Sequence, residues 1–129
     1  LLLVNIMNES DVSRGHVKLE KNIGHVPRVF KELAKTSPEM HDAVLTLDNF
    51  IWADNALTRK EKKLIAISVA ASLRDTHATR AQLTGAKALG VSLAEIDEAL
   101  RVSFMLSGMP AYVQGITTAE SVYGDKKEM

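Results

Sequence analysis

Residues 58–73 read TRKEKKLIAISVAASL and predict a helix whose start can be located from the sequence. Thr58 and Glu61 match the T-x-x-E pattern of a capping box, in which each side chain accepts a hydrogen bond from the other residue's backbone N–H. The run from Leu64 to Leu73 is apolar or small nearly all round, so we expect this helix to be buried on most sides. The run is flanked by charge and is shorter than the about 20 residues that a membrane span needs.

Helix-period apolar positions recur on both sides of this stretch, and no window alternates for long between apolar and polar residues. Ser37 and Pro38 are typical of an N-cap and a first helical residue, and a second capping box runs from Ser92 to Glu95. We expect an all-α, single-domain helical bundle of six or seven helices. The pattern places them near residues 12–22, 26–35, 38–52, 58–73, 75–89, from 92, and from about 110.

Two of these helices carry a face of apolar or small residues. The helix after Pro38 carries an apolar stripe, formed by Met40, Val44, Leu47 and Ile51. The helix near 75–89 carries small residues that let a neighbouring helix approach closely, namely Ala78, Ala81, Gly85 and Ala88. Together with the apolar run at 64–73, the small face indicates more apolar surface than one short subunit can bury, so we expect a homo-oligomer.

The composition of the 129 residues limits the classes of function. Sixteen basic residues balance sixteen acidic ones, so the chain lacks the electrostatic footprint of a protein that binds nucleic acid or an anionic membrane. It has no cysteine, which excludes disulfides, zinc–thiolate sites and thiol catalysis by this chain alone. This fits a reducing compartment, and we expect a cytoplasmic protein. We expect neither a metal nor a cofactor, because no metal-ligand spacing links the histidines, His16, His25, His41 and His77.

The chain begins LLLVNIM, which is too short to span a bilayer. It also lacks the basic region, the longer apolar core and the cleavage site of a signal peptide. Two interpretations stay open. Either Met7 is the natural start, or residues 1–6 form a short apolar arm that packs on a neighbour.

The segment RDTHATRAQLTGAKALG follows the apolar run directly and gathers polar side chains on one predicted helix. Asp75 and Gln82 share one face of this helix, and His77 and Arg80 share another. An anionic ligand near the first turn would meet backbone amides together with Arg74 and Arg80, and His77 could transfer protons near neutral pH. A simpler interpretation stays open, in which Asp75 caps the helix while His77 and Arg80 form a solvated face or a subunit contact.

Several segments occur in a characteristic order: GHVPRVFKELAKTSPEM, a tryptophan, ALTRKEKKLIAISVAASL, the histidine-bearing helix, GAKALGVSLAEIDEAL and SGMPAYV. In this order and spacing they resemble the carboxymuconolactone decarboxylase family, which belongs to the alkyl hydroperoxidase D-like superfamily. The resemblance covers roughly residues 23–123. It implies that residues 23–129 form the family's helical domain, that residues 1–22 form an arm and a first helix, and that the protein assembles as a homo-trimer or homo-hexamer.

The peroxidase branch of this superfamily uses a C-x-x-C pair, a later histidine and an earlier glutamate. In the resemblance, the two cysteine positions fall on Asp75 and Ala78, with His77 matching a histidine sometimes found between them. The later histidine falls on Gln82 and the glutamate on Lys63. An aspartate and an alanine cannot form a disulfide, so the thiol–disulfide mechanism is absent from this chain.

The decarboxylase branch acts on a lactone that bears carboxylates, and its helix resembles R-x-H-x-x-R-x-H followed by R-G-A. His77 and Arg80 match this pattern best. Arg74 lies one residue from the expected spacing, and Gln82 stands where the second histidine would be. The resemblance implies that His77 protonates the product and that Arg80 holds a carboxylate. Such a pair lowers the barrier because decarboxylation leaves negative charge on carbon.

The expected site therefore has catalytic residues His77 and Arg80, surrounded by substrate-binding residues Arg74, Asp75, Gln82 and Trp52. Trp52, or a residue of a neighbouring subunit, would close the apolar side of the pocket. Three functions stay open. The first is an acid–base enzyme, such as a decarboxylase, that acts on a small carboxylated lactone or related organic acid. The second is a non-catalytic module that binds a small anion, and the third is a structural or partner-binding oligomer.

Overall fold

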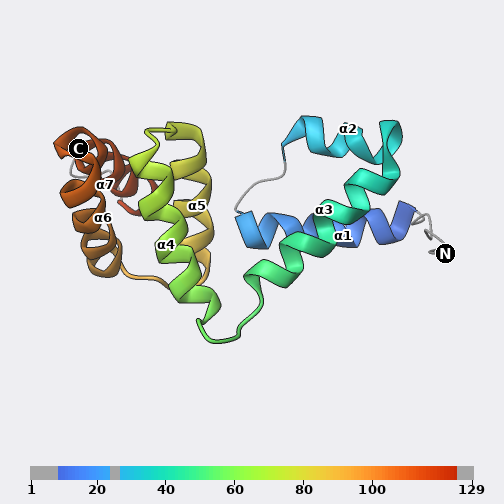
Figure 1. Cartoon of the computed structure of the whole chain (residues 1–129), viewed down its shortest axis with the longest axis horizontal. Helices are drawn as coiled ribbons and strands as arrows, with labels where there is room; N and C mark the ends of the chain where they lie inside the picture. Colours follow the sequence, from blue (N-terminus) through green and yellow to red (C-terminus); the bar gives the residue numbers. More distant parts are fainter. Residues whose placement is uncertain (1–8, 24–26, 125–129) are drawn as a thin grey trace. The chain divides into compact units, whose positions relative to one another are not determined.

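The computed structural model describes residues 9–23 and 27–124, and these residues form helices and no strand (Figure 1). The all-α prediction and the expected number of helices are confirmed. Met7, the arm at residues 1–6 and His25 lie outside the described residues. The helices are α1 (Glu9–Ile23), α2 (Arg28–Thr36), α3 (Pro38–Trp52), α4 (Arg59–Ser72), α5 (Thr76–Ala88), α6 (Leu93–Ser107) and α7 (Met109–Tyr123).

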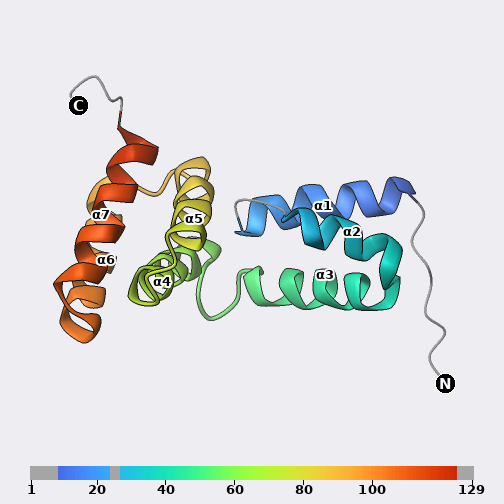
Figure 2. The ribbon, with the colours of Figure 1, turned by 90° about the horizontal axis from the view of Figure 1, so that it is seen from above.

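The helices group into two compact units, which divide between Ala53 and Asp54. In the first unit, α3 packs against both α1 and α2. In the second, α4 contacts α5, α6 and α7, and α7 also packs on α5 and α6 (Figure 2). The domain boundary expected after residue 22 stays a prediction, because a compact unit is not in itself a domain that folds alone. No helix among the described residues is both long and apolar enough to cross a membrane.

The helix ends follow local sequence signals closely. Both expected capping boxes are present, with Thr58 and Ser92 each accepting from the backbone N–H of a glutamate three residues on. Asp75 caps α5 by accepting from the backbone N–H of Ala78 at 2.9 Å. Gly90 ends the same helix at a φ of 81°, in the left-handed region where glycine is favoured. Ser37 departs from expectation, because it precedes α3 without a side-chain cap bond, and α1 begins at Glu9, earlier than the expected start near Val12.

The core of the second unit lies where its four helices meet. Ile67 of α4, Leu83 of α5 and Leu100 of α6 are fully buried there. Gly115 lets α7 approach closely, since a Cβ atom at this position would lie 2.5 Å from Leu100 Cδ2. The second unit therefore has a continuous apolar interior.

Helix α4 is covered on most sides, as expected from its apolar sequence, but one of its faces is exposed. Ile67 and Ala71 are fully buried, but Ile65, Val69 and Leu73 are 51%, 52% and 74% exposed. The reason is geometric: its neighbours α5, α6 and α7 leave one face uncovered, although the apolar residues continue around the helix.

The apolar stripe of α3 also faces outward over much of its length. Met40 and Leu47 are each 58% exposed, whereas the buried residues of this helix are His41 and Leu45. Leu45 meets Leu19 of α1 in a small core that Phe30 of α2 partly covers. The first unit therefore buries few apolar side chains of its own among the described residues.

Candidate functional site

The turn that leads into α5 is held by Arg74. This residue has a φ of 58°, in the left-handed region that side-chain-bearing residues rarely occupy. Its backbone N–H donates to the carbonyl of Ala71, and the next N–H donates to Ala70, which together close a Schellman turn. The Arg74 guanidinium donates to the Ser107 carbonyl at 2.8 Å and so fastens the turn to the end of α6. Arg74 therefore has a structural role whether or not it contacts a ligand.

His77 and Arg80 lie on the exposed part of α5, one helical turn apart. The Arg80 guanidinium donates to Ser121 Oγ of α7 at 3.2 Å, which ties this side chain to the neighbouring helix. A guanidinium has five N–H donors, so one bond to a hydroxyl leaves capacity for a carboxylate. The two residues expected to carry the chemistry are thus close in sequence and accessible to a ligand.

Gln82 points instead toward a buried lysine. Lys63 of α4 is fully buried, and its Nζ donates to Gln82 Oε1 at 2.8 Å. A buried ammonium is costly unless polar groups satisfy it, and the Gln82 amide is one such group. The site list from the sequence omitted Lys63, although the resemblance placed it at a position of the redox relay. Lys63 lies one helical turn before Ile67, and this spacing was the signal that could have placed it on the buried face of α4.

Three of the substrate-binding residues expected around His77 and Arg80 contact different partners within the second unit. Asp75 caps α5, Gln82 meets Lys63, and Arg74 reaches the end of α6. Trp52 ends α3 in the first unit, and its expected place beside the site stays a prediction. The structure thus gives three of these side chains internal partners of their own.

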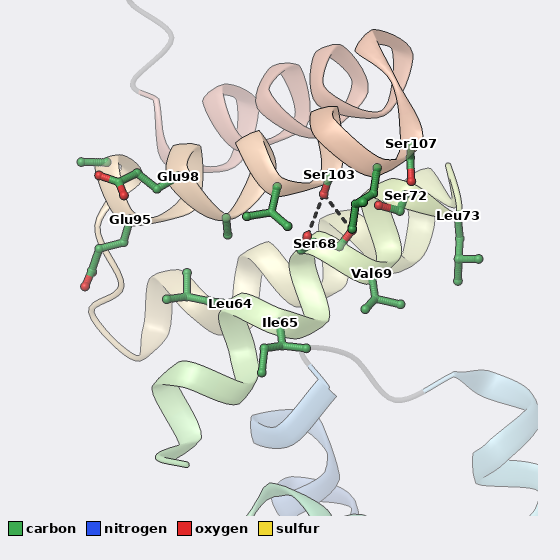
Figure 3. A pocket seen from close by; sticks show the side chains of 14 residues that line it. Leu64, Ile65, Ser68, Val69, Ser72, Leu73, Glu95, Glu98, Ser103 and Ser107 are labelled. Atoms are coloured by element: carbon green, nitrogen blue, oxygen red, sulfur yellow. Dashed lines mark hydrogen bonds between the residues drawn. The ribbon is translucent and has the colours of Figure 1, made fainter.

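A groove between α4 and α6 of the second unit has a volume of about 930 Å³ (Figure 3). Ser68 and Ser103 meet inside it: the Ser103 hydroxyl donates to the Ser68 carbonyl at 2.9 Å, and the two hydroxyl oxygens lie 2.8 Å apart. Its walls are mostly apolar, and neither His77 nor Arg80 lines it. The apolar wall residues include Ile65, Val69, Leu73, Val102 and Leu106.

The titratable groups with shifted pKa values in this unit hold the helices together. Burial raises the pKa of Tyr123 to about 12, and its hydroxyl donates to the Val91 carbonyl at 2.8 Å. The Ser92 backbone N–H, followed by Lys60, lowers the pKa of Glu95 at the start of α6. A hydrogen bond to Asp97 raises the pKa of Tyr112. These shifts have structural causes and do not mark an acid–base pair.

Across residues 9–23 and 27–124, no three or more His, Asp or Glu side chains gather as they would to hold a metal ion. Two histidines of the first unit, His16 and His41, do lie in direct contact.

The segment from residue 38 to residue 121, more than half of the chain, matches the profile of the carboxymuconolactone decarboxylase family. The chain belongs to the carboxymuconolactone decarboxylase family. The family match runs from the start of α3 into α7 and includes the whole of α4, α5 and α6. The resemblance deduced from the sequence motifs is therefore confirmed.

Two relatives of this chain are described only as uncharacterized proteins. The uncharacterized protein MJ0742 of Methanocaldococcus jannaschii is 34% identical over 107 residues, which cover 82% of this chain and all of that protein. A second uncharacterized protein of the same organism, MJ1511, is 27% identical over 92 residues, covering 71% of this chain and 86% of that protein.

The fold also matches a solved structure. A provisionally assigned carboxymuconolactone decarboxylase of Burkholderia xenovorans LB400 has a TM-score of 0.73 and 22% identity. The match covers 88% of this chain and 92% of that chain. At this identity the likeness shows the fold of a family member and leaves its substrate open.

Proposed function

We propose that this family member binds a small organic acid, such as a carboxylated lactone, at the His77–Arg80 face of α5 and performs acid–base chemistry on it. The observation that carries the proposal is the exposure of both side chains one turn apart on a helix within the family match. Thiol chemistry is excluded because the chain has no cysteine. The proposal includes a cytoplasmic location, which the cysteine-free composition fits.

Each residue has a separate role in this reaction. Arg80, oriented by Ser121, binds a substrate carboxylate with its remaining N–H donors and keeps it beside the reacting carbon. When a second carboxylate leaves as CO₂, the electrons of the broken C–C bond stay on carbon. Protonated His77 then delivers a proton to that carbon, which completes the replacement of CO₂ by hydrogen.

The proposal also requires an apolar wall that α5 does not supply by itself. Small-molecule sites are mostly apolar with a few convergent polar groups, and a second copy of the chain would provide the missing surface. We therefore include a homo-trimer or homo-hexamer in the proposal. The exposed apolar residues of α4 and α6 support it, since such surface is typical of subunit interfaces.

One observation favours a second candidate, a non-catalytic protein that binds small anions. The resemblance puts a histidine where this chain has Gln82, and Gln82 is engaged by Lys63. An amide cannot exchange a proton near neutral pH, so the site has one acid–base group fewer than the decarboxylase pattern.

Turnover and binding distinguish the two candidates. Purified protein is mixed with a carboxylated lactone, CO₂ release is measured, and thermal stabilisation by the same compound reports binding. We expect Arg80→Ala to weaken binding by about 1.5–3 kcal/mol, the scale of a lost charged hydrogen bond. We expect His77→Ala to slow turnover more than it weakens binding.

Arg101→Ala serves as the matched control, because Arg101 is also an exposed arginine but is paired with Asp97 on α6. It should leave both measurements unchanged. Binding without turnover would favour the non-catalytic protein. Equal binding by the wild type, Arg80→Ala and His77→Ala would contradict both candidates.

A further inference from the structure

Two histidines of the first unit contact each other directly through ring nitrogens. His16 Nε2 on α1 lies 2.7 Å from His41 Nε2 on α3, with the rings inclined at 77°. His41 is fully buried, and its Nδ1 lies 3.0 Å from Asp42 Oδ1. These contacts form a chain of three side chains, Asp42–His41–His16, and none of them belongs to the proposed site on α5.

The hydrogen-bond partners determine where the protons lie. An ionised carboxylate can only accept, so His41 Nδ1 must carry a proton and donate it to Asp42. In neutral His41 the other nitrogen, Nε2, is then an acceptor. His16 must donate to it from its own Nε2. At neutral pH the pair therefore shares a single proton along its N···N contact.

The hydrogen bonds of the two imidazoles also limit how many protons the pair can take up. After one added proton the two facing nitrogens still share a single N–H, so the contact can stay closed. A second added proton would place an N–H on both facing nitrogens and a positive charge on both rings. At 2.7 Å this arrangement removes the hydrogen bond and opposes two like charges, so the contact must open.

Aromatic and charged side chains surround the two histidines. Phe30 of α2 stacks on His41 at a centroid distance of 4.7 Å and meets the His16 ring edge-on at 5.7 Å. Lys31 of α2 adds positive charge, and the described ionisable groups along the neighbouring cleft are Asp11, Arg14 and Lys18 of α1 with Asp42 of α3. Burial, then His41, then Lys31 lower the pKa of His16.

The buried apolar contact between α1 and α3 is small. The buried apolar core of the first unit among the described residues consists of Leu19 and Leu45, with Phe30 packed against them. Gly15 brings the two helices close, since a Cβ atom there would lie 2.6 Å from Leu45 Cδ1. Loss of the imidazole contact would therefore remove a polar contact that joins α1 to α3 beside this small core.

We propose that the His16–His41 contact is a proton-sensitive clasp, which holds α1 on α3 at neutral pH and releases it in mild acid. The unfolded or detached histidines bind two protons below about pH 6, whereas the closed pair binds one. The difference of one proton makes the equilibrium constant for opening rise by up to tenfold for each unit of falling pH. The closed state binds fewer protons than the open state, so a rise in pH favours the closed state.

Hydrogen exchange of the full chain tests the clasp. The backbone amides of α1 are followed by mass spectrometry between pH 7.5 and pH 5, after correction for the intrinsic pH dependence of exchange. We expect the opening constant of α1 to rise by up to tenfold per pH unit below about pH 6.5. His16→Gln is the diagnostic variant, because an amide can donate to or accept from His41 Nε2 without becoming charged.

In His16→Gln the opening constant of α1 should change little between pH 7.5 and pH 5. His77→Gln is the control, because it removes a histidine from the other unit, and it should behave as the wild type. Wild-type exchange that is no steeper with pH than that of His16→Gln would overturn the proposal. Imidazole ¹⁵N spectra give a second test on the unmodified chain. We expect the pair to gain one proton while α1 stays protected, and a gain of two with α1 still protected would also overturn it.

Discussion

The buried contact between Lys63 and Gln82 makes a quantitative prediction about stability. Gln82→Leu removes the acceptor that lies 2.8 Å from Lys63 Nζ and leaves the buried ammonium with one polar partner fewer. The loss of a hydrogen bond to a charged group costs about 1.5–3 kcal/mol. We therefore expect Gln82→Leu to lower the free energy of unfolding by that amount.

The paired substitution should behave differently. Lys63→Met keeps a long apolar stem but removes the charge, so in Lys63→Met/Gln82→Leu neither a buried ammonium nor its acceptor remains. Replacing both partners of a buried polar contact by apolar groups is often close to neutral. We expect the double variant to be more stable than the sum of the two single effects by at least about 1 kcal/mol.

Urea unfolding followed by circular dichroism measures these differences. With a slope of about 1–3 kcal/mol per molar urea, a loss of about 2 kcal/mol moves the midpoint by roughly 1 M. Lys60→Met is the matched control, because Lys60 pairs with Glu95 on the surface at 2.9 Å and such pairs contribute about 0–1 kcal/mol. Strict additivity of the two single substitutions would refute the claim that Lys63 and Gln82 stabilise each other.

Two further predictions concern packing and assembly. Gly115→Ala should destabilise the protein by about 1–3 kcal/mol in thermal unfolding, because the new Cβ would meet Leu100. Thr117→Ala, on the exposed face of α7, is the control and should change stability by no more than about 0.5 kcal/mol. Equal effects of the two substitutions would contradict the close approach of α7 to Leu100. Light scattering at micromolar concentration should give a mass above that of one chain, and Leu106→Glu, at a position 81% exposed on α6, should shift it toward the monomer. A monomeric wild type would rule out the assembly.

The sequence predicts the helix ends well because each depends on a few neighbouring residues. Thr58 with Glu61, and Ser92 with Glu95, satisfy backbone N–H groups within one turn, so no distant part of the chain affects them. The exposure of Ile65 on α4 could not be predicted in the same way. An apolar residue on an all-apolar helix is buried only if a neighbour covers that face, and the neighbours are a property of the fold.

In the candidate site, too, the sequence predicts features within one helix but not the contacts between helices. His77 and Arg80 could be placed on one helix face from their spacing alone, and the structure leaves that face exposed. The contact of Arg80 with Ser121 joins α5 to α7, and the His16–His41 contact joins residues 25 positions apart. Both depend on how helices pack, which spacing within one helix does not reveal.

Four of the positions that match the redox relay of the peroxidase branch form two internal pairs in this chain. The two cysteine positions are Asp75 and Ala78, and here the Asp75 carboxylate accepts from the Ala78 backbone N–H to cap α5. The glutamate and histidine positions are Lys63 and Gln82, and here they share a buried hydrogen bond. All four positions therefore take part in contacts that stabilise α5, and none supplies a thiol or a carboxylate–imidazole relay.

The contacts of these four residues limit where a ligand can meet α5. The side chains that face α4 or cap α5 are engaged with one another, so a ligand that meets α5 has to do so at its outer surface. His77 and Arg80 lie on that surface, and Arg80 is already oriented by Ser121. An acid–base reaction at this face needs no group from Lys63, Asp75, Ala78 or Gln82. That independence supports the proposed function, and it predicts that Gln82→Leu should lower stability while leaving ligand binding by Arg80 intact.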